Sequence, residues 1–345
     1  MALLLEKEDI RELVAQVGLD VLIEDVIQCL REDYGRWHDF DKSARVANHY
    51  PHGVIELMPV SDADYYSFKY VTGHPKNPVD GKLTVAAFGA LAETRSGYPV
   101  MISEMTLVTA IRTAATSVFA AQLLANEKAR TMALIGTGCQ AEFQSYGFYH
   151  SFGITEIRYY DVDPAAMEKY ARNMQGHPVR LVACDSVDAA CEGAEIISTV
   201  TADKANRTVV SRQHLTPGVH FNGVGGDCPG KTELAPDMLD DLKIVVEYEP
   251  QSRIEGEIQA LPADSPVTEL WQVLAGDVDI RTNDDDMTLF DSVGFALEDY
   301  SALRCIYEHC QRLGLGRTSS LIFTPDNPKD LFSELRASGS ARQIA

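Results

Sequence analysis

The sequence lacks the features of a nucleic-acid-binding or membrane-spanning protein. Its 345 residues contain 30 Lys and Arg against 51 Asp and Glu, so the net charge is −21. No cluster of basic residues offsets this negative field, which would repel nucleic acid and anionic membrane surfaces. No segment approaches the roughly 20 apolar residues that a membrane helix needs. We therefore expect neither a nucleic-acid partner nor a membrane partner.

Patterns for metal binding, disulfides and nucleophilic catalysis are missing as well. The seven cysteines are scattered without a C-x-x-C pair, and the nine histidines form no H-E-x-x-H motif, so we expect no metal site and no disulfide framework. No G-x-S-x-G motif is present. The first apolar run, Met-Ala-Leu-Leu-Leu, is too short and meets acidic residues too soon for a signal peptide. Reduced thiols in the cytoplasm are the simplest interpretation.

The patterning changes twice along the chain. Residues 7–38 show helical spacing, and residues 44–102 contain short strand-like runs at 54–58, 65–71, 85–91 and 98–102, which predict an antiparallel β-unit. Ser103 could cap a long helix that ends near Ala125. From Thr131 onward, strands and helices alternate, which predicts parallel strands covered by helices. Another helix is expected after Asp291.

The fold class predicted from these patterns is α/β. A Rossmann-type parallel-sheet domain would be joined to an α+β domain with antiparallel strands. We assign residues 116–314 to the first domain, and residues 1–115 together with 315–345 to the second.

Residues 131–161 carry the pattern of a dinucleotide site. An apolar strand from Thr131 runs into G-x-G-x-x-A. Gly136 would permit the tight turn, Gly138 the approach of a pyrophosphate, and Ala141 close packing of helix on strand. The next strand ends at Asp161, whose carboxylate would accept the ribose hydroxyls and repel a 2′-phosphate, so NAD is favoured over NADP.

Several charged residues stand in apolar surroundings. Arg112 is the single charge between residues 105 and 126; it could face solvent, or it could bind a phosphate or a substrate carboxylate. Glu56 shares a strand face with apolar neighbours, and Lys69 lies in an aromatic run. Because one face of an antiparallel sheet is often solvated, both could simply face water, and Arg45 would pass as a surface residue.

A second glycine-rich loop follows the predicted strand at 218–224. Asp227 is its one carboxylate. This loop would lie at the carboxyl edge of the sheet, where ligands bind in open α/β folds. Asp227 could cap a helix starting near Pro229, and capping does not exclude a catalytic role.

Long motifs in order along the chain resemble the ornithine cyclodeaminase/mu-crystallin family. The matching stretches are Phe40-Asp-Lys-Ser-Ala-Arg45-Val, Gly53-Val-Ile-Glu56-Leu-Met-Pro, Phe68-Lys69-Tyr-Val, Leu107 to Thr116, Asn222-Gly-Val-Gly-Gly-Asp227-Cys-Pro-Gly-Lys231-Thr-Glu-Leu, residues 246–257 and residues 290–300.

This resemblance implies roles at the matching positions. Asp227 would be the catalytic acid and base. The substrate would be held by Arg45, Glu56, Lys69, Arg112 and Val293. The NAD site would be lined by Thr84, Arg112, Gly136, Gly138, Cys139, Gln140, Asp161, Thr201, Val224, Gly225, Gly226, Asp227, Lys231 and Ser292. The resemblance also implies a homodimer joined through the antiparallel β-unit, so the second domain would bind substrate and dimerise.

The activity that the resemblance implies is conversion of L-ornithine to L-proline and ammonia, with tightly retained NAD reduced and reoxidised in one turnover. Ring closure is intramolecular and so would outcompete attack by water. Two alternatives stay open: an NAD(P)-dependent imine reductase or amino-acid dehydrogenase of the same family, and a binding protein without catalysis, like mu-crystallin. The length of the accepted side chain cannot be read from the sequence.

Overall fold

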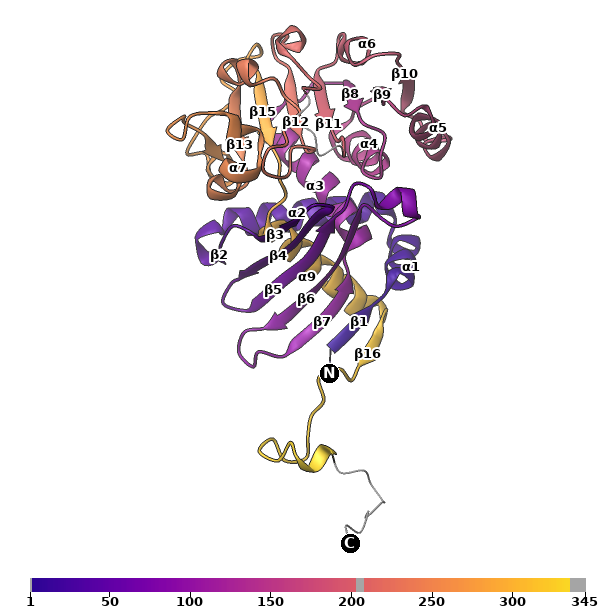
Figure 1. Cartoon of the computed structure of the whole chain (residues 1–345), viewed down its shortest axis with the longest axis vertical. Helices are drawn as coiled ribbons and strands as arrows, with labels where there is room; N and C mark the ends of the chain where they lie inside the picture. Colours follow the sequence, from indigo (N-terminus) through magenta and orange to yellow (C-terminus); the bar gives the residue numbers. More distant parts are fainter. Residues whose placement is uncertain (1, 203–207, 336–345) are drawn as a thin grey trace.

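The computed structural model describes residues 2–202 and 208–335, and within them it builds two sheets (Figure 1). The last ten residues of the predicted second domain, 336–345, lie outside the described residues. The first sheet has the order β16-β1-β7-β6-β5-β4-β2, with β3 on β4. Its strands are β1 (Ala2–Leu5), β2 (Asp41–Lys42), β3 (Val46–Tyr50), β4 (Gly53–Ser61), β5 (Tyr65–Gly73), β6 (Val85–Glu93), β7 (Pro99–Glu104) and β16 (Arg317–Ser319).

The second sheet is parallel throughout its described pairs, with the order β10-β9-β8-β11-β12-β15-β13-β14. Its strands are β8 (Thr131–Ile135), β9 (Glu156–Tyr160), β10 (Arg180–Ala183), β11 (Ile196–Thr199), β12 (His220–Gly223), β13 (Lys243–Val246), β14 (Thr268–Glu269) and β15 (Thr288–Asp291). The predicted α/β class is confirmed.

The helices that surround and connect the two sheets are α1 (Lys7–Val17), α2 (Leu19–Gly35), α3 (Thr106–Leu124), α4 (Ala141–Gly147), α5 (Pro164–Asn173), α6 (Val187–Cys191), α7 (Glu249–Glu255), α8 (Leu270–Ala275) and α9 (Ala296–Leu313). Shorter helical turns are η1 (Trp37–Asp39), η2 (Asn77–Asp80), η3 (Phe148–Phe152), η4 (Arg212–His214), η5 (Pro236–Asp241), η6 (Glu257–Ala260) and η7 (Ser333–Leu335).

Both faces of the second sheet are buried. On β8, Met132 and Leu134 enter one apolar cluster, and Ala133 and Ile135 enter another on the opposite face. Parallel strands covered on both faces read as continuous apolar runs, which is why the sequence located most of them. It missed β15, a four-residue strand in the middle of the sheet that follows a polar loop.

Two predicted helix features are wrong. The helix expected over residues 7–38 is interrupted at Gly18, whose φ of +94° is costly for other residues and turns the chain between α1 and α2. Ser103 does not cap α3, because it belongs to β7 and donates to the Glu104 carbonyl at 2.9 Å. The Glu104 carboxylate takes the capping place, accepting the Leu107 N–H at 3.1 Å.

The expectation that no segment is long and apolar enough for a membrane helix is also wrong. By length and composition α3 passes such a test, with a mean hydropathy of 1.4, but 78% of the tested window is buried inside the protein. The helix packs against α2, α4, α9 and β15. Its apolar character is therefore that of a core helix between the two sheets.

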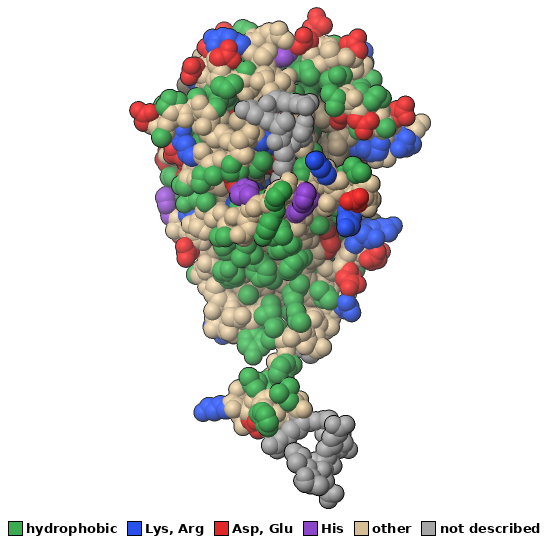
Figure 2. All heavy atoms as spheres, viewed as in Figure 1, with side chains coloured by type: hydrophobic (Ala, Val, Ile, Leu, Met, Phe, Trp, Pro, Cys, Tyr) green, Lys and Arg blue, Asp and Glu red, His purple; other side chains and the backbone are tan. Residues whose placement is uncertain are grey.

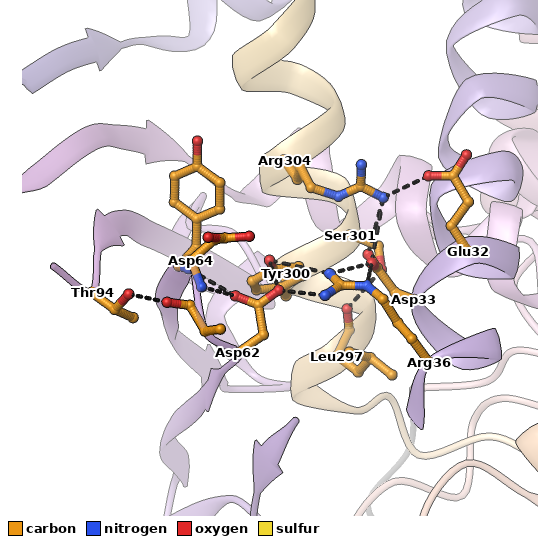
Figure 3. A network of polar contacts seen from close by, with 12 residues as sticks. Glu32, Asp33, Arg36, Asp62, Asp64, Thr94, Leu297, Tyr300, Ser301 and Arg304 are labelled. Carbon is orange, nitrogen blue, oxygen red and sulfur yellow. Dashed lines mark hydrogen bonds and ion pairs between the residues drawn. The ribbon is translucent and has the colours of Figure 1, made fainter. Parts of the chain in front are cut away.

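Helix α9 follows the second sheet in sequence but packs on the first, against β4, β5, β6 and α2 (Figure 1). A polar network fastens it there (Figure 3): Tyr300 donates to Asp62 at 2.7 Å, and Ser301 donates to Asp33 at 2.7 Å. Arg36 joins the same two acids, at 2.6 Å from Asp62 and 2.7 Å from Asp33. The predicted division of the chain at 115/116 and 314/315 stays a prediction.

Candidate active site

The glycine turn after β8 has the geometry that a dinucleotide site requires. Gly136 has φ +102°, and a Cβ there would stand 3.0 Å from the Val200 backbone. A Cβ on Gly138 would meet nothing within 4 Å, so this backbone is open to a ligand. A cavity of about 770 Å³ starts at Gly138 and Cys139 and continues between α4 and α5. Ala141 is buried at the start of α4.

The acid after β9 lies over this turn. Asp161 accepts the Thr137 N–H at 2.6 Å and its hydroxyl at 3.1 Å. Among the described residues, the buried Oε1 of Gln140 has no hydrogen-bond donor. Open backbone at Gly138, an adjacent carboxylate and an unsatisfied amide oxygen fit a bound dinucleotide.

The second glycine-rich loop is packed against buried carboxylates. A Cβ on Gly225 would stand 2.3 Å from the Glu233 carboxylate, and one on Gly226 would stand 2.4 Å from Glu257. Glu233 accepts the N–H of Gly225 at 3.0 Å and that of Thr201 at 2.9 Å. These contacts place residues 224–227 and Thr201, at the carboxyl ends of β12 and β11, side by side.

Asp227 ends this loop with its side chain 52% exposed, whereas that of Lys231 is 4% exposed at 3.3 Å from it. No helix begins at Pro229, so the predicted capping role of Asp227 is wrong. Lys231 also donates to the Thr201 carbonyl at 3.0 Å. Although burial disfavours the charged lysine, Asp227 and Glu233 raise the pKa of Lys231 above its ordinary value.

Arg45 lies in a buried ion cluster rather than on the surface. Its side chain is 6% exposed, with Nη1 at 3.0 Å from Glu56 and Nε at 3.0 Å from Glu255. Nη2 donates to the carbonyls of Val293 and Gly294. Burial, helped by Glu56 and Asp227, raises the pKa of Glu255 to about 7 even though Arg45 lowers it. A surface position for Arg45 and a solvated position for Glu56 are therefore wrong.

Lys69 and Arg112 form a second buried cluster, so the solvent-facing alternatives for these two residues are wrong as well. Lys69 Nζ lies 2.8 Å from Asp299, and Arg112 contacts Asp299 at 2.9 Å and Glu298 at 2.7 Å. Burial, together with Arg112, lowers the pKa of Lys69 to about 8. The anions that satisfy Arg112 here belong to the chain itself.

The loop after β15 joins the two clusters. Glu247, directly after β13, accepts the Ser292 hydroxyl at 2.7 Å and the N–H groups of Val293 and Gly294 at 3.1 and 2.9 Å. These contacts fix the carbonyls that receive Arg45. Arg45 and Arg112, the latter 3.0 Å from a Cβ built on Gly294, thus both meet the loop at the carboxyl ends of β13 and β15. Ligands bind at this edge in open α/β folds.

One predicted residue is not brought into the site by a described contact, and four residues of the site were not predicted. The backbone contact that places Thr84 is with His74, at 2.8 Å, so its membership of the site stays a prediction. The missed residues are the buried acids that hold the cations and the 292–294 loop: Glu247, Glu255, Glu298 and Asp299. For Glu298 and Asp299 the signal was present, since two adjacent acids on an otherwise apolar helix segment before Tyr300 require buried cations.

Comparison with known proteins agrees with this architecture. An ornithine cyclodeaminase of Brucella suis biovar 1 (strain 1330) is 53% identical over 324 residues, which are 94% of this chain and 90% of that protein. The solved structure of a lysine cyclodeaminase, described with recognition of L-lysine, L-ornithine and L-2,4-diaminobutyric acid, is 29% identical, with a TM-score of 0.90 over 96% of this chain and 98% of that one.

A second solved structure, an archaeal alanine dehydrogenase dimer with bound NAD, is 27% identical, with a TM-score of 0.84 over 93% of this chain and 99% of that one. The model of the ornithine cyclodeaminase/mu-crystallin family matches residues 7–313. This chain therefore belongs to the ornithine cyclodeaminase/mu-crystallin family.

Proposed function

We propose that this protein is an NAD-dependent ornithine cyclodeaminase, an ammonia-lyase that converts L-ornithine to L-proline and ammonia. The observation that carries the proposal is the 53% identity to the Brucella suis ornithine cyclodeaminase across 94% of the chain. The site gives this likeness a physical basis, because it sets buried cations and carboxylates from two domains around one sheet edge.

The charges of the site suit a diamino acid. Lys69 and Arg112 would bind the substrate carboxylate, with Arg45 and Val293 beside it. Glu56, Glu255 and Asp227 act together on the single guanidinium of Arg45. Even when Lys231 is counted beside Asp227, these three acids outnumber the two cations, which favours a substrate that carries a second ammonium group.

NAD would be held by residues at the carboxyl ends of the parallel strands: Thr84, Arg112, Gly136, Gly138, Cys139, Gln140, Asp161, Thr201, Val224, Gly225, Gly226, Asp227, Lys231 and Ser292. The NAD bound to the related alanine dehydrogenase supports this choice. When bound, NAD would supply the acceptor for the hydride from Cα and return that hydride within the same turnover, so the overall reaction is redox-neutral.

Asp227 would move the protons of the reaction. Its exposed carboxylate can take a proton from a substrate ammonium and leave a nucleophilic amine, and it can return that proton to the departing ammonia. Lys231, buried behind it with a raised pKa, would hold Asp227 in place. Ring closure then joins two ends of one molecule, which is favoured over attack by water.

The outer face of the first sheet supports a homodimer. Strand alternation turns Leu57, Tyr66 and Phe88 outward, each at least 40% exposed. Tyr70 stacks on Phe88 with 5.2 Å between ring centroids. Figure 2 shows the apolar side chains gathered over this region. A patch of this kind on a sheet is typical of a protein–protein interface, and we assign it to a second copy of this chain. Cytoplasmic placement stays a prediction.

The experiment is an assay that follows ammonia and the NADH absorbance together, for the NAD-loaded enzyme with L-ornithine, L-lysine and L-alanine. Ornithine should release ammonia and give L-proline without net NADH. Stoichiometric NADH from alanine would instead make the protein a dehydrogenase. Absence of turnover with every amino acid, despite NAD binding, would support the non-catalytic alternative.

A further inference from the structure

One oxygen of Asp299 contacts two buried cations that come from different elements. Its Oδ1 accepts Lys69 Nζ, from β5, at 2.8 Å and Arg112 Nε, from α3, at 2.9 Å. Asp299 and Lys69 are each 1% exposed. A shared acceptor fixes how far apart the two cations lie and in which direction each points, because both hydrogen bonds must meet at the same atom.

Both cations keep donors beyond those that Asp299 uses. An ammonium has three N–H donors and a guanidinium has five. Lys69 makes one hydrogen bond to a described residue, so it uses one of its three N–H donors. Arg112 uses its Nε and Nη1 donors. The pair can therefore present further N–H groups to a second carboxylate while Asp299 holds it in place.

We infer that Asp299 is a positioning residue that sets Lys69 and Arg112 as a pair of cations for the carboxylate of the amino-acid substrate. This inference rests on the proposed function. Asp299 would act through the two cations and not directly on the reacting atoms or the cofactor.

The rest of α9 keeps Asp299 in register with the first sheet. The next residue, Tyr300, enters the network of Figure 3 and donates to Asp62 at 2.7 Å. Asp62 lies between β4 and β5, and β5 carries Lys69. The hydrogen bond between Tyr300 and Asp62 thus ties the helix that carries Asp299 to the hairpin that carries Lys69.

Two further observations favour a role in binding over a role in stability. The buried Oδ2 of Asp299 has no donor among the described residues, whereas most buried polar atoms of native proteins have a hydrogen-bond partner. The charge of Asp299 also acts on the protonation of Lys69. Burial and Arg112 lower the pKa of Lys69 to about 8, Asp299 opposes them, and Arg45 adds to the lowering. Across the sheet from Lys69 stand the uncharged Met58 and Gly89.

The test compares Asp299→Asn, Asp299→Glu and Asp33→Asn by the kcat and KM for L-ornithine between about pH 6.5 and 9.5. In the unchanged enzyme, KM should be low while Lys69 is protonated and should rise above about pH 8. Asp299→Asn should raise KM about tenfold or more, the scale of a lost charge-assisted hydrogen bond, with a smaller change in kcat. The pH at which KM rises should also move downward, because Lys69 loses its neighbouring negative charge.

Asp299→Glu keeps the charge and should bring the pH of the KM rise back toward that of the unchanged enzyme. Its longer side chain displaces the shared acceptor oxygen, so KM itself should stay above that of the unchanged enzyme. Asp33→Asn removes another fully buried acid that is bonded to α9. It should lower the melting temperature but leave KM and its pH dependence unaltered. The titration of ornithine itself is common to all variants and cancels in the comparison.

The inference is overturned if Asp299→Asn behaves like Asp33→Asn, with a lower melting temperature and the same pH dependence of KM. If Asp299→Asn does not fold, Asp299→Glu decides: an unaltered KM also overturns the inference. Because every α-amino acid carries the same carboxylate, the pH series applies to any amino acid that the enzyme turns over. If the enzyme turns over another amino acid but not ornithine, the proposed function is rejected. The role of Asp299 is then tested with that other amino acid.

Discussion

Lys231 lies behind Asp227, with its Nζ 3.3 Å from the carboxylate and its side chain 4% exposed against 52% for Asp227. The acid is half-exposed, while the cation that supports it is inside the protein. This arrangement suits a carboxylate that exchanges protons with a ligand while a buried cation holds it in place.

Replacing Asp227 should abolish catalysis without removing the cofactor. Asp227→Asn keeps the shape of the side chain but cannot accept a proton, so kcat for ammonia release should fall by at least about a hundredfold, the usual worth of a general acid–base group. NAD should still bind, as measured by calorimetry. Asp188→Asn is the matched control, since Asp188 is a 70% exposed acid whose side-chain partners are Gln213 at 2.7 Å and His214 at 2.8 Å. Substantial ammonia release by Asp227→Asn would contradict the assigned role.

Adding a methyl group at Gly138 should weaken NAD binding without harming the fold. A Cβ at this position meets nothing within 4 Å in the protein, so the melting temperature should hold. The methyl group would occupy the space where a pyrophosphate approaches the backbone, and the Kd for NAD should rise about tenfold or more. Gly35→Ala, also with nothing within 4 Å, is the control; it should keep NAD affinity intact. Equal NAD affinities of the two variants would remove Gly138 from the site.

A charge on the outer face of the first sheet should separate the homodimer. Phe88 is 47% exposed in the single chain, and Phe88→Glu would bury an unpaired carboxylate in the interface, at a cost on the order of several kcal/mol. Light scattering should then give the monomer mass. Val162→Glu changes an 87% exposed residue of the other domain and should leave the dimer intact. A Phe88→Glu protein that still has the dimer mass would place the interface elsewhere.

Stability should fall as pH rises from about 4 to about 7. Burial raises the pKa of Asp291 to about 7, although it accepts the N–H groups of Glu257 and Ile258. Its folded pKa thus lies above the unfolded value of about 4. The folded state therefore binds the proton more tightly, and this stabilisation is complete below about pH 4 and is lost as pH passes through 7, by at most about 1.4 kcal/mol per pH unit.

Urea unfolding at pH 5 and pH 7.5 measures this slope. Asp291→Asn should be less stable overall but should show a smaller decrease between the two pH values. Asp285→Asn, in an exposed loop, should keep the slope of the unchanged protein. An identical slope in Asp291→Asn would show that other groups cause the pH dependence.

What the sequence by itself determined is local. Gly136, Gly138 and Ala141 are three residues of one turn, and β8 is one apolar run, so adjacent residues specify both. The long family motifs likewise located Asp227 and Lys231 in one loop. Short elements such as β15, which is Thr-Leu-Phe-Asp, were missed because four residues with two apolar side chains show neither a period nor an apolar run.

Only the tertiary structure decided what the isolated charges do. Lys69 and Asp299 are 230 residues apart, and nothing in the strand pattern around Lys69 distinguishes an ammonium in water from one bonded to a buried acid. The same holds for Arg45, which is joined to Glu255 through the approach of two domains. A buried charge needs a counter-charge beside it. The packing of α9 and α7 places these counter-charges, and no local sequence pattern encodes that packing.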